Sequence, residues 1–523
     1  MGKLERMSGN QNVVIPMMGT GQRFVDAGYS THKTLLQIRG KSVLEHILGN
    51  YSWAKTVHLL TSDQTADRVQ ELVPQFAKYG PEIKVHVGRP HKLGPVWSLL
   101  QFEDAIEKED PVWVNYSDFG WVWSRENEAP AVPEEAEVLV PFYRGFHPHN
   151  NGTTNYAYMK LEEQRIVAIQ EKIPFSEDKR NEPASSGTYY FKTWEFAMDL
   201  ARKVVSSEST VGGEYFVSQM VDHALIGRKR CQALEIPFFF QWGTPEDLEL
   251  FVSVTDSLDH FKPSQSNTPP KVDLPTVFLA AGEARRFQKE GLPCDKYNLP
   301  FAGTTILSLA METLSNGPIF VARGDLCNVA PRLKQKARIY SIEKSSGQLH
   351  SAIESAKFLL DEGVLNLSSW VCFAPSDTLL SLSDSLDGAI EAGADAIVLT
   401  REPNLLDWEN AEQYGWVFEH RTSLHFSIKR RPSKSSKPKV LTGAFVLRIE
   451  DLLITGNKLL GGKNQAREVL LDDLLAEMSD LGQSIHCATS KALSLGTPEE
   501  YKAAIYFQQA LASKEELEVG GEN

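Results

Sequence analysis

Six short segments occur twice in this chain of 523 residues, in the same order, with the second occurrence 253 to 263 residues after the first. VVIPMMGTGQRF begins at Val13 and has its counterpart in TVFLAAGEARRF from Thr276. A period of this length is far too long for a solenoid, so the pattern predicts a tandem duplication of a whole domain. The other matched pairs are Lys33 with Lys296, Gly94 with Gly347, Asp118 with Asp377, Gly187 with Gly443, and Gly243 with Gly496.

The length agrees with a duplication, because a chain of this size exceeds what one hydrophobic core ordinarily covers. Between the two copies lies DHFKPSQSNTPPKVDLP, whose Pro, Ser and Asn content is typical of a linker. We therefore expect a first domain at residues 1–260, a linker at 261–274 and a second domain at 275–523.

Each copy alternates short apolar runs with segments of helical apolar spacing. In the first copy the runs lie at residues 12–16, 56–61, 83–87, 112–116 and 137–143, with helical patterns at 42–51 and 65–79. Apolar strands that alternate with helices indicate an α/β fold, in which a mainly parallel twisted sheet has helices on both faces. Such sheets bind ligands at the carboxyl ends of their strands.

Charge and cysteine content exclude several classes of protein. A net charge of −14 argues against a broad nucleic-acid or membrane-binding surface. The five cysteines (Cys231, Cys294, Cys327, Cys372 and Cys487) form no CxxC pair and indicate free thiols in a reducing compartment. The polar start resembles no signal peptide, and no apolar run is long enough to span a bilayer. We expect a cytoplasmic protein.

The turn after the first predicted strand has the composition of a phosphate-binding loop. Gly19 and Gly21 let backbone N–H groups approach phosphates, and Arg23 and Lys33 supply positive charge. A tight turn with solvated charges beside it would have the same composition. The segment is not a Walker A motif, and Phe24 replaces the third glycine of a dinucleotide fingerprint.

Three further residues have the chemistry of a substrate site. Asp118 ends the run VWVNYSD, where a carboxylate is a natural Mg²⁺ ligand or, equally, a loop cap. Glu171 and Lys172 are adjacent in IQEKIPF and can divide a sugar phosphate between them, or form an ordinary surface ion pair. His147 and His149 indicate a polar loop, because no further Cys or His ligand lies near them in the sequence.

The order of these motifs, continued by SGTYYF, GEY and WGTPEDL, resembles the NDP-sugar pyrophosphorylase superfamily of sugar-phosphate nucleotidyltransferases, with its GT-A-like Rossmann fold. The resemblance covers nearly all of the first copy, and the second copy looks like a more diverged member. It implies three catalytic residues, Arg23, Lys33 and Asp118, with Asp118 as the metal ligand. It also implies nucleotide contacts from Gly19, Gly21 and Gly94, and acceptor contacts from Glu171, Lys172, Gly187 and Glu214.

The implied reaction is transfer of a nucleoside monophosphate from an NTP to a sugar 1-phosphate or a related phosphorylated acceptor. Pyrophosphate leaves, Mg²⁺ is the cofactor, and the product is an activated nucleotide sugar for surface polysaccharide or glycoconjugate synthesis. The implied partners are an NTP and a small phosphorylated acceptor, without nucleic acid or membrane. The nucleophile is already an anion, so positioning and charge neutralisation would carry the catalysis.

The chain departs from the family pattern at three places. His32 and Thr34 replace the prolines on either side of Lys33, and Ile173 separates Lys172 from Pro174. Gln241 and Trp242 occupy the stretch where many members have a second metal-binding Asp. A neutral amide is a poor magnesium ligand, so Asp118 is expected to hold the ion together with phosphates and water.

Three other functions fit the same residues to a lesser degree. One is a cytidylyltransferase for a phosphorylated alcohol or amide. A second is a GT-A glycosyltransferase, although YSDFGW has only one Asp of the usual DxD motif. A third is a nucleotide-sensing protein, which the second copy makes worth considering.

The second copy keeps the nucleotide side of the pattern and changes the acceptor side. It retains Gly282, Arg286, Lys296, Gly347 and Asp377, while Ala284 replaces the second loop glycine. In IKRRP, Arg430 and Arg431 align with the Glu–Lys pair, and two guanidinium groups suit a more anionic ligand. We therefore expect this copy to bind a nucleotide or phosphorylated ligand, either as a second transferase or as a regulatory site. The basic run from Lys434 to Lys439 indicates a solvated loop.

Overall fold

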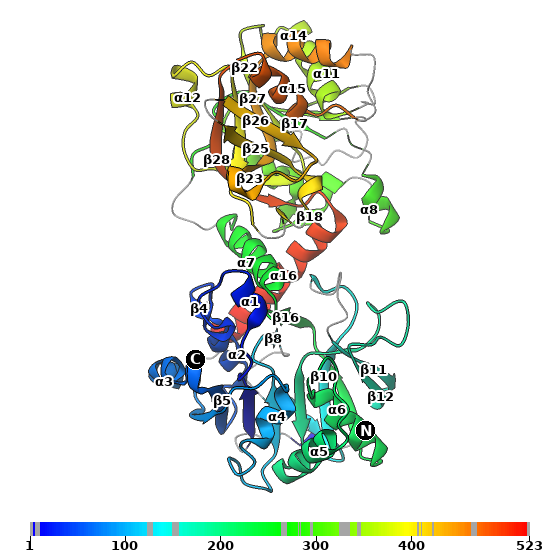
Figure 1. The fold of residues 1–523 in the computed structure, drawn as a ribbon. Helices are drawn as coiled ribbons and strands as arrows, with labels where there is room; N and C mark the ends of the chain where they lie inside the picture. The colour runs from blue at the N-terminus through cyan, green and yellow to red at the C-terminus, as the bar shows by residue number, and fades with distance from the viewer. Residues whose placement is uncertain are drawn as a thin grey trace. The chain divides into compact units, whose positions relative to one another are not determined.

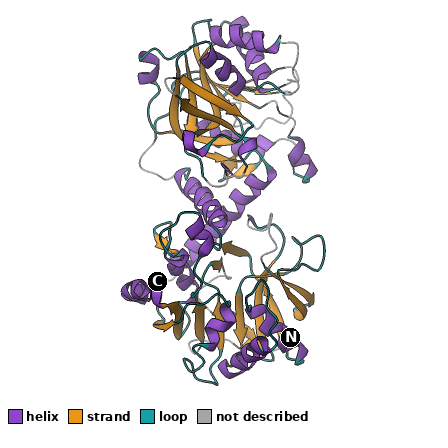
Figure 2. Ribbon diagram, viewed as in Figure 1, coloured by secondary structure: helices purple, strands orange, loops and turns teal. Residues whose placement is uncertain are grey.

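The structure is a computed structural model that describes residues 4–5, 11–122, 129–148, 156–262, 269–280, 282, 284–292, 296–323, 335–342, 347–404, 407–408, 410–420, 423–461 and 468–519. The chain forms two compact units (Figures 1 and 2). The N-terminal unit comprises Met1–Val252 together with Tyr506–Asn523, and the C-terminal unit comprises Ser253–Ile505. The last helix, α16 (Pro498–Val519), thus contributes to both units, which a linear division of the chain does not anticipate. Residues 263–268 of the expected linker lie outside the described residues.

The N-terminal unit is built on a sheet of mixed direction. Its strand order is β13-β11-β12-β15-β10-β14-β7-β2-β5-β6. The pairs β2–β5, β5–β6, β2–β7 and β10–β15 are parallel, and the other pairs of this sheet are antiparallel. The strands are β2 (Asn12–Pro16), β5 (Thr56–Ser62), β6 (Glu82–Gly88), β7 (Val112–Asn115), β10 (Val138–Tyr143), β11 (Ala157–Glu162), β12 (Arg165–Glu171), β13 (Ala184–Ser185), β14 (Thr188–Phe191) and β15 (Cys231–Glu235).

The expectation of a mainly parallel sheet is therefore right for β6-β5-β2-β7 and wrong for most of the remainder. The reason is that β14 and β10 are fully buried although they pair antiparallel. An apolar run records burial on both faces, and it carries no information on strand direction.

Side chains that alternate along the central strands cover both faces of this sheet. Val112 and Val114 belong to the core cluster that also contains residues of helices α4 (Pro95–Leu100), α5 (Trp194–Ser206) and α6 (Val217–Ile226). Trp113, between the two valines, instead contacts Tyr190 with a tilted ring and Trp53 with an edge-to-face ring. The two-residue period of a strand thus directs Val112 and Val114 to one face of the sheet and Trp113 to the other.

Two helices in the first half of this unit, α2 and α3, occupy the segments whose apolar spacing predicts them. Helix α2 (Val43–Leu48) begins after Ser42, whose side chain and that of Glu45 form a reciprocal capping box. Helix α3 (Asp63–Phe76) occupies the second predicted helical segment and continues into a 3₁₀ turn at Ala77–Tyr79.

The C-terminal unit has a curled sheet of mixed direction (Figure 1). Its main path is β21-β20-β17-β22-β27-β24-β28-β23, with the hairpin β25–β26 attached to β27. The strands are β17 (Thr276–Leu279), β20 (Ile319–Arg323), β21 (Arg338–Ser341), β22 (Trp370–Pro375), β23 (Thr378–Leu382), β24 (Ala396–Arg401), β25 (Gly415–His420), β26 (Ser423–Ile428), β27 (Lys439–Arg448) and β28 (Ile485–Ser494).

The first seven strands of that path repeat the order and directions of β6-β5-β2-β7-β14-β10-β15 in the N-terminal unit. In both units the first three pairings are parallel, the next two are antiparallel, and the last is parallel. Within the described part of the chain, every helix is too short or too polar to traverse a lipid bilayer.

Candidate active site

A cavity of about 510 Å³ lies in the N-terminal unit, next to the carboxyl ends of β2 and β7. This is the edge at which open α/β sheets bind their ligands. All of the site residues predicted for the first copy line it: Gly19, Gly21, Arg23, Lys33, Gly94, Asp118, Glu171, Lys172, Gly187 and Glu214. Segments that are distant in the sequence thus meet around one space of the size of a small ligand.

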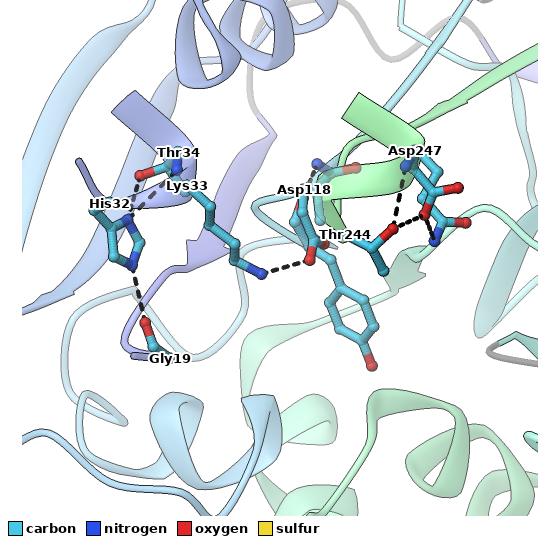
Figure 3. A network of polar contacts seen from close by, with 10 residues as sticks. Gly19, His32, Lys33, Thr34, Asp118, Thr244 and Asp247 are labelled. Carbon is cyan, nitrogen blue, oxygen red and sulfur yellow. Dashed lines mark hydrogen bonds and ion pairs between the residues drawn. The ribbon is translucent and has the colours of Figure 1, made fainter. Parts of the chain in front are cut away.

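His32 ties the glycine turn to the segment that carries Lys33 (Figure 3). Its Nε2 donates to the carbonyl of Gly19 over 2.9 Å, and its Nδ1 lies 2.8 Å from the hydroxyl of Thr34. Burial lowers the pKa of His32, which favours the neutral ring, and a neutral Nδ1 can accept from Thr34 N over 3.5 Å. The histidine therefore fixes the loop where the family pattern has a proline.

The turn itself has the backbone geometry that glycine permits. Gly21 has φ 61° and precedes the short helix α1 (Gln22–Asp26), on which Arg23 is exposed. A Cβ at Gly19 would contact nothing within 4 Å, so this stretch of backbone is open to a ligand.

Lys33 and Asp118 form an ion pair inside the cavity (Figure 3). Lys33 Nζ lies 2.5 Å from Asp118 Oδ2, and each side chain is 17% exposed. Asp118 lies between β7 and β8 (Phe119–Val122), and its carbonyl accepts a hydrogen bond from Trp242 N over 2.8 Å. A Cβ at Gly243 would lie 3.0 Å from Asp118 Oδ2, so glycine at that position leaves room for the carboxylate.

Gln241 stands where a second metal carboxylate would be expected. The Tyr156 hydroxyl donates to its Oε1, and its Nε2 donates to Asp247 Oδ2 over 2.6 Å. Thr244 Oγ1 also donates to this Asp247 oxygen, over 2.8 Å (Figure 3). The amide is thus held in one orientation by a donor on one side and an acceptor on the other.

The donor set fits a magnesium ion that is shared with substrate. Among the described residues, no group of three or more His, Cys, Asp or Glu side chains comes together as a complete metal site. Asp118 supplies one carboxylate oxygen ligand of the kind that Mg²⁺ prefers, and protein sites for this ion commonly rely on substrate phosphates and water for the rest.

Glu171 and Lys172 lie at the end of β12, on the wall of the cavity. Ser218 Oγ donates to Glu171 Oε2 over 2.6 Å, while burial raises the pKa of Glu171 to about 7. Lys172 has φ 60°, its N–H donates to Tyr156 O, and its Nζ lies 4.3 Å from the centroid of the Phe216 ring. The pair therefore presents a buried carboxyl group with a raised pKa and a lysine side chain to the same space.

Two predicted glycines are required by close packing. Gly94 has φ 85°, and a Cβ there would lie 2.7 Å from Tyr215 O, beside Glu214. Gly187 has φ 73°, and a Cβ there would lie 2.0 Å from Phe119 Cδ2. These residues bring the loops around the cavity together, and any other residue would force them apart.

The cavity also contains residues that the motifs did not indicate. His91, Lys92, Tyr116 and Phe216 line it, and Ser218 reaches it through Glu171. His91 and Lys92 lie just before Gly94, so a cation next to a predicted nucleotide-binding glycine was an available signal. Tyr116 accepts a hydrogen bond from Val217 N, a contact with no counterpart in sequence spacing.

The C-terminal unit repeats the lysine–aspartate contact. Lys296 Nζ forms an ion pair with Asp377 Oδ2, and Leu495 N donates to Asp377 O over 2.9 Å. Gly347 precedes helix α11 (Gln348–Asp361), and Gly282 and Arg286 are exposed. Ala284 has the same left-handed backbone as Gly21, with φ 49°.

The two predicted acceptor residues of the second copy, Arg430 and Arg431, come one and two residues after the position that the strand register matches with Lys172. Arg430 and Arg431 are exposed after the end of β26, and Arg431 donates to the Trp408 carbonyl. The strand registers match Lys429 with Lys172 instead: Lys429 has φ 52°, and its N–H donates to Tyr414 O.

Of the two histidines in the predicted polar loop, His147 and His149, the structure describes only the first. His147 is buried, and its Nδ1 lies 2.6 Å from the Tyr506 hydroxyl. His149 lies outside the described residues.

Residues 13–226 match the family model described as nucleotidyl transferase. No match was found among curated protein sequences.

Similar solved structures each cover somewhat less than half of the chain. A nucleoside-diphosphate-sugar pyrophosphorylase from Vibrio cholerae RC9 is 18% identical over 45% of this chain and 97% of its own, with a TM-score of 0.38. An inositol-1-phosphate CTP transferase from T. maritima is 14% identical over 47% and 93%, with a TM-score of 0.35. A UDP-glucose pyrophosphorylase complexed with UDP-glucose is 16% identical over 46% and 95%, with a TM-score of 0.36.

The match to the family model runs from β2 through α6 and includes most of the residues that line the cavity, but not Gln241 and Gly243. Residues 13–226 thus form a nucleotidyl transferase domain.

Proposed function

We propose that the N-terminal unit transfers a nucleoside monophosphate from an NTP to a sugar 1-phosphate. The observation that carries this proposal is the convergence of the glycine turn, Lys33, Asp118 and the Glu171–Lys172 pair on one cavity. The product, an activated nucleotide sugar, is the donor that glycoconjugate and surface polysaccharide synthesis consumes.

The reaction is an in-line displacement at the α-phosphorus of the NTP. A phosphate oxygen of the acceptor forms a new bond to the α-phosphorus. The bond between the α-phosphorus and the oxygen that bridges it to the β-phosphate breaks, and pyrophosphate leaves with the electron pair. Because the nucleophile is an anion, no proton has to be removed from it. Lys33 and Arg23 bind and orient the phosphates and offset the charge that develops on them.

Asp118 would hold the Mg²⁺ ion, with the remaining ligands from phosphates and water. When bound, this ion supplies neutralisation of phosphate charge. Gln241 is uncharged and hydrogen-bonded to both Tyr156 and Asp247, so it adds no second anionic ligand.

The acceptor lies against Glu171 and Lys172. Lys172 attracts the acceptor phosphate, and Glu171 makes hydrogen bonds with sugar hydroxyls. A pKa of about 7 lets the Glu171 carboxyl group act as acceptor or donor near neutral pH.

We further propose that the C-terminal unit is a diverged copy of the N-terminal one. The shared order and direction of seven strands support this, as do the matched ion pairs Lys33–Asp118 and Lys296–Asp377. A glycine next to each aspartate supports it too. Gly243 leaves room for the Asp118 carboxylate, and Gly496 leaves room for that of Asp377.

The test uses the full-length protein, because Tyr506–Asn523 belong to the N-terminal unit. Each common NTP is combined with a panel of sugar 1-phosphates, phosphorylated alcohols and phosphorylated amides, and pyrophosphate is measured. We expect release only when Mg²⁺ and an acceptor phosphate are both present. Folded protein that releases no pyrophosphate with any acceptor would contradict the proposal, and preference for CTP with an alcohol phosphate would replace the sugar acceptor.

A further inference from the structure

A second cavity, of about 620 Å³, lies within the C-terminal unit. It is lined by the carboxyl end of helix α7 (Pro245–His260), the segment before β17, the carboxyl end of helix α9 (Ile306–Leu314) and one residue of β23. Lys296, Gly347 and Asp377, which match predicted site residues of the first copy, are not among its lining residues. The cavity is therefore not the counterpart of the first one, although its volume is that of a small-molecule site.

Buried carbon side chains form part of the cavity wall. Phe261, Leu309 and Met311 line the cavity and are 7%, 6% and 1% exposed. Phe261 follows α7, whereas Leu309 and Met311 lie on α9, so two separate segments contribute to this apolar surface. Such a surface favours a ligand that has an apolar or aromatic part over water alone.

Two buried polar atoms of lining residues have no hydrogen-bond partner in the part of the chain that the structure describes. One is the hydroxyl of Ser381, on β23, a residue that is 2% exposed, and the other is Nε2 of His260. Burial lowers the pKa of His260, which favours a neutral ring whose Nε2 can donate or accept a hydrogen bond. Unpaired buried groups of this kind are uncommon in folded proteins. Ordered water or a ligand would supply their partners, and the charge around the cavity distinguishes the two.

The charge on the cavity wall is mainly positive. Three lysines line it, Lys262, Lys271 and Lys336, against a single carboxylate, Glu312. Lys336 forms an ion pair with Glu312, and Lys262 Nζ lies 3.4 Å from Asp259 Oδ1. Lys271, in contrast, is half-buried and forms no ion pair within the described chain. The wall thus has the charge of an anion-binding site.

Lys271 is held at the wall by the backbone next to it. Val272 N donates to Leu314 O over 2.8 Å, and Asn316 N donates to Val272 O over 3.0 Å. These bonds place Lys271 beside the carboxyl end of α9, where a cation is favourable. A fully solvated lysine would satisfy that preference, however, whereas a half-buried one loses part of its hydration. An anionic ligand would offset this loss.

We infer that this cavity binds a small phosphate ester with an aromatic body, which is the chemistry of a nucleotide. The phosphate lies near Lys271, where its charge offsets the positive excess that three lysines and one glutamate leave. The aromatic body packs on Phe261 and the residues of α9, and Ser381 and His260 form hydrogen bonds with its polar atoms. The inference does not depend on the proposed function, because the two cavities share no lining residue.

Hydrogen–deuterium exchange of the full-length protein tests the inference, because its peptides report on the two cavities separately. The probes are the common nucleoside monophosphates, the corresponding nucleosides and inorganic phosphate, each at the same millimolar concentration. We expect the monophosphates to slow exchange in peptides from 255–262, 306–320 and 378–384. The nucleosides, which lack the charge, and inorganic phosphate, which lacks the aromatic body, should have much smaller effects.

Lys271→Ala examines the role of the lysine that has no ion pair. It should weaken the affinity read from these peptides about tenfold, the cost of losing one charged hydrogen bond to the phosphate. Lys357→Ala removes an exposed lysine of the same unit, which pairs with Glu354 outside the cavity, and should leave the affinity unchanged.

Ser381→Ala distinguishes a binding role from a structural one. It removes a hydroxyl that has no partner in the protein, so the midpoint of urea unfolding should not fall, whereas the affinity should weaken roughly fivefold. Ser490→Ala is the matched control on the neighbouring strand β28, because Ser490 Oγ donates to Thr400 O over 3.2 Å. It should lower the midpoint and leave the affinity unchanged.

Unchanged exchange in the three C-terminal peptides with every probe would overturn the inference, and it would leave the proposed function intact. Equal protection by the nucleosides or by inorganic phosphate would overturn the assigned class of ligand. Unchanged affinity in both Lys271→Ala and Ser381→Ala would show that the ligand binds outside this cavity.

Discussion

Lys33 and Asp118 are 85 positions apart in the sequence, yet Lys33 Nζ lies 2.5 Å from Asp118 Oδ2. Each charge is largely buried and is compensated by the other. The two groups that we propose for the transfer reaction, a cation for phosphate and a carboxylate for a metal ion, are therefore held together at the edge of the sheet. Lys296 and Asp377 repeat the relationship.

Lys33→Ala should lower kcat/KM for pyrophosphate release by about 10²-fold or more, because it removes a preorganised charge from the phosphates in the transition state. Lys78→Ala, which breaks an exposed ion pair with Glu45, serves as the matched control and should have little effect. Turnover near the unmodified rate in Lys33→Ala would mean that the phosphates bind elsewhere.

Asp118→Asn should remove the Mg²⁺ dependence together with most of the activity, since the neutral amide is a poor ligand for this ion. Asp110→Asn is the control: Asp110 lies near the other end of β7 and bonds to Asn12. Mg²⁺ titrations of steady-state rates distinguish the two variants. A normal Mg²⁺ requirement in Asp118→Asn would assign the ion to other ligands.

Glu171→Gln and Lys172→Ala should each raise the KM for the acceptor roughly 10-fold or more, the cost of losing one charged hydrogen bond, with a smaller change in the KM for the NTP. Lys192→Ala, an exposed change just after β14, should alter neither constant. The opposite pattern, with the NTP constant more affected, would move the pair to the nucleotide side of the cavity.

Stability should depend on pH through Glu171. Burial raises its pKa from the ordinary 4.5 to about 7, so the folded protein binds this proton more tightly than the unfolded chain does. The contribution is complete below about pH 4.5 and is lost as the pH rises through about 7. Glu171→Gln should flatten this part of the profile in urea unfolding, whereas Glu177→Gln, on the exposed loop that follows, should not. An unchanged slope in Glu171→Gln would contradict the assignment.

Gly187→Ala should destabilise the N-terminal unit by about 3 kcal/mol, since it combines a left-handed backbone with a Cβ inside the Phe119 ring. Gly145→Ala isolates the backbone part: Gly145 has φ 85°, but a Cβ there meets nothing within 4 Å. Its cost should be about 1 kcal/mol. Equal losses in denaturant unfolding would show that contact with Phe119 is relieved at no cost.

The central strands and the residues around the cavity could be predicted from the sequence. The run at 12–16 is β2, and the run at 56–61 is β5 with one more residue, because turn residues bound both. Motif order indicated which loops carry glycines and charges, and the carboxyl ends of the parallel strands bring those loops together.

What the sequence could not supply were strand direction and contacts made across the fold. The contact between Ser218 and Glu171 joins a helix to a strand 47 positions away, with no periodicity to reveal it. The sequence aligns Arg430 and Arg431 with the Glu–Lys pair, whereas the hairpin register pairs Ile428 with Gly415, as the register of the first unit pairs Glu171 with Ala157. A shift of one or two residues along a strand changes which side chain faces the site.

Tyr506 gives the N-terminal unit an unusual place in the order of protein synthesis. Its hydroxyl accepts from Phe239 N and donates to Phe239 O, and the adjacent Phe507 packs near Phe240 and Phe251. A ribosome that has made Met1–Val252 has not yet made this segment, so the unit that emerges first must wait for residues from Tyr506 onward. Until then the aromatic surface around Phe239 remains open on the nascent chain. Separating the two halves into independent polypeptides would divide one hydrophobic core between two translation products.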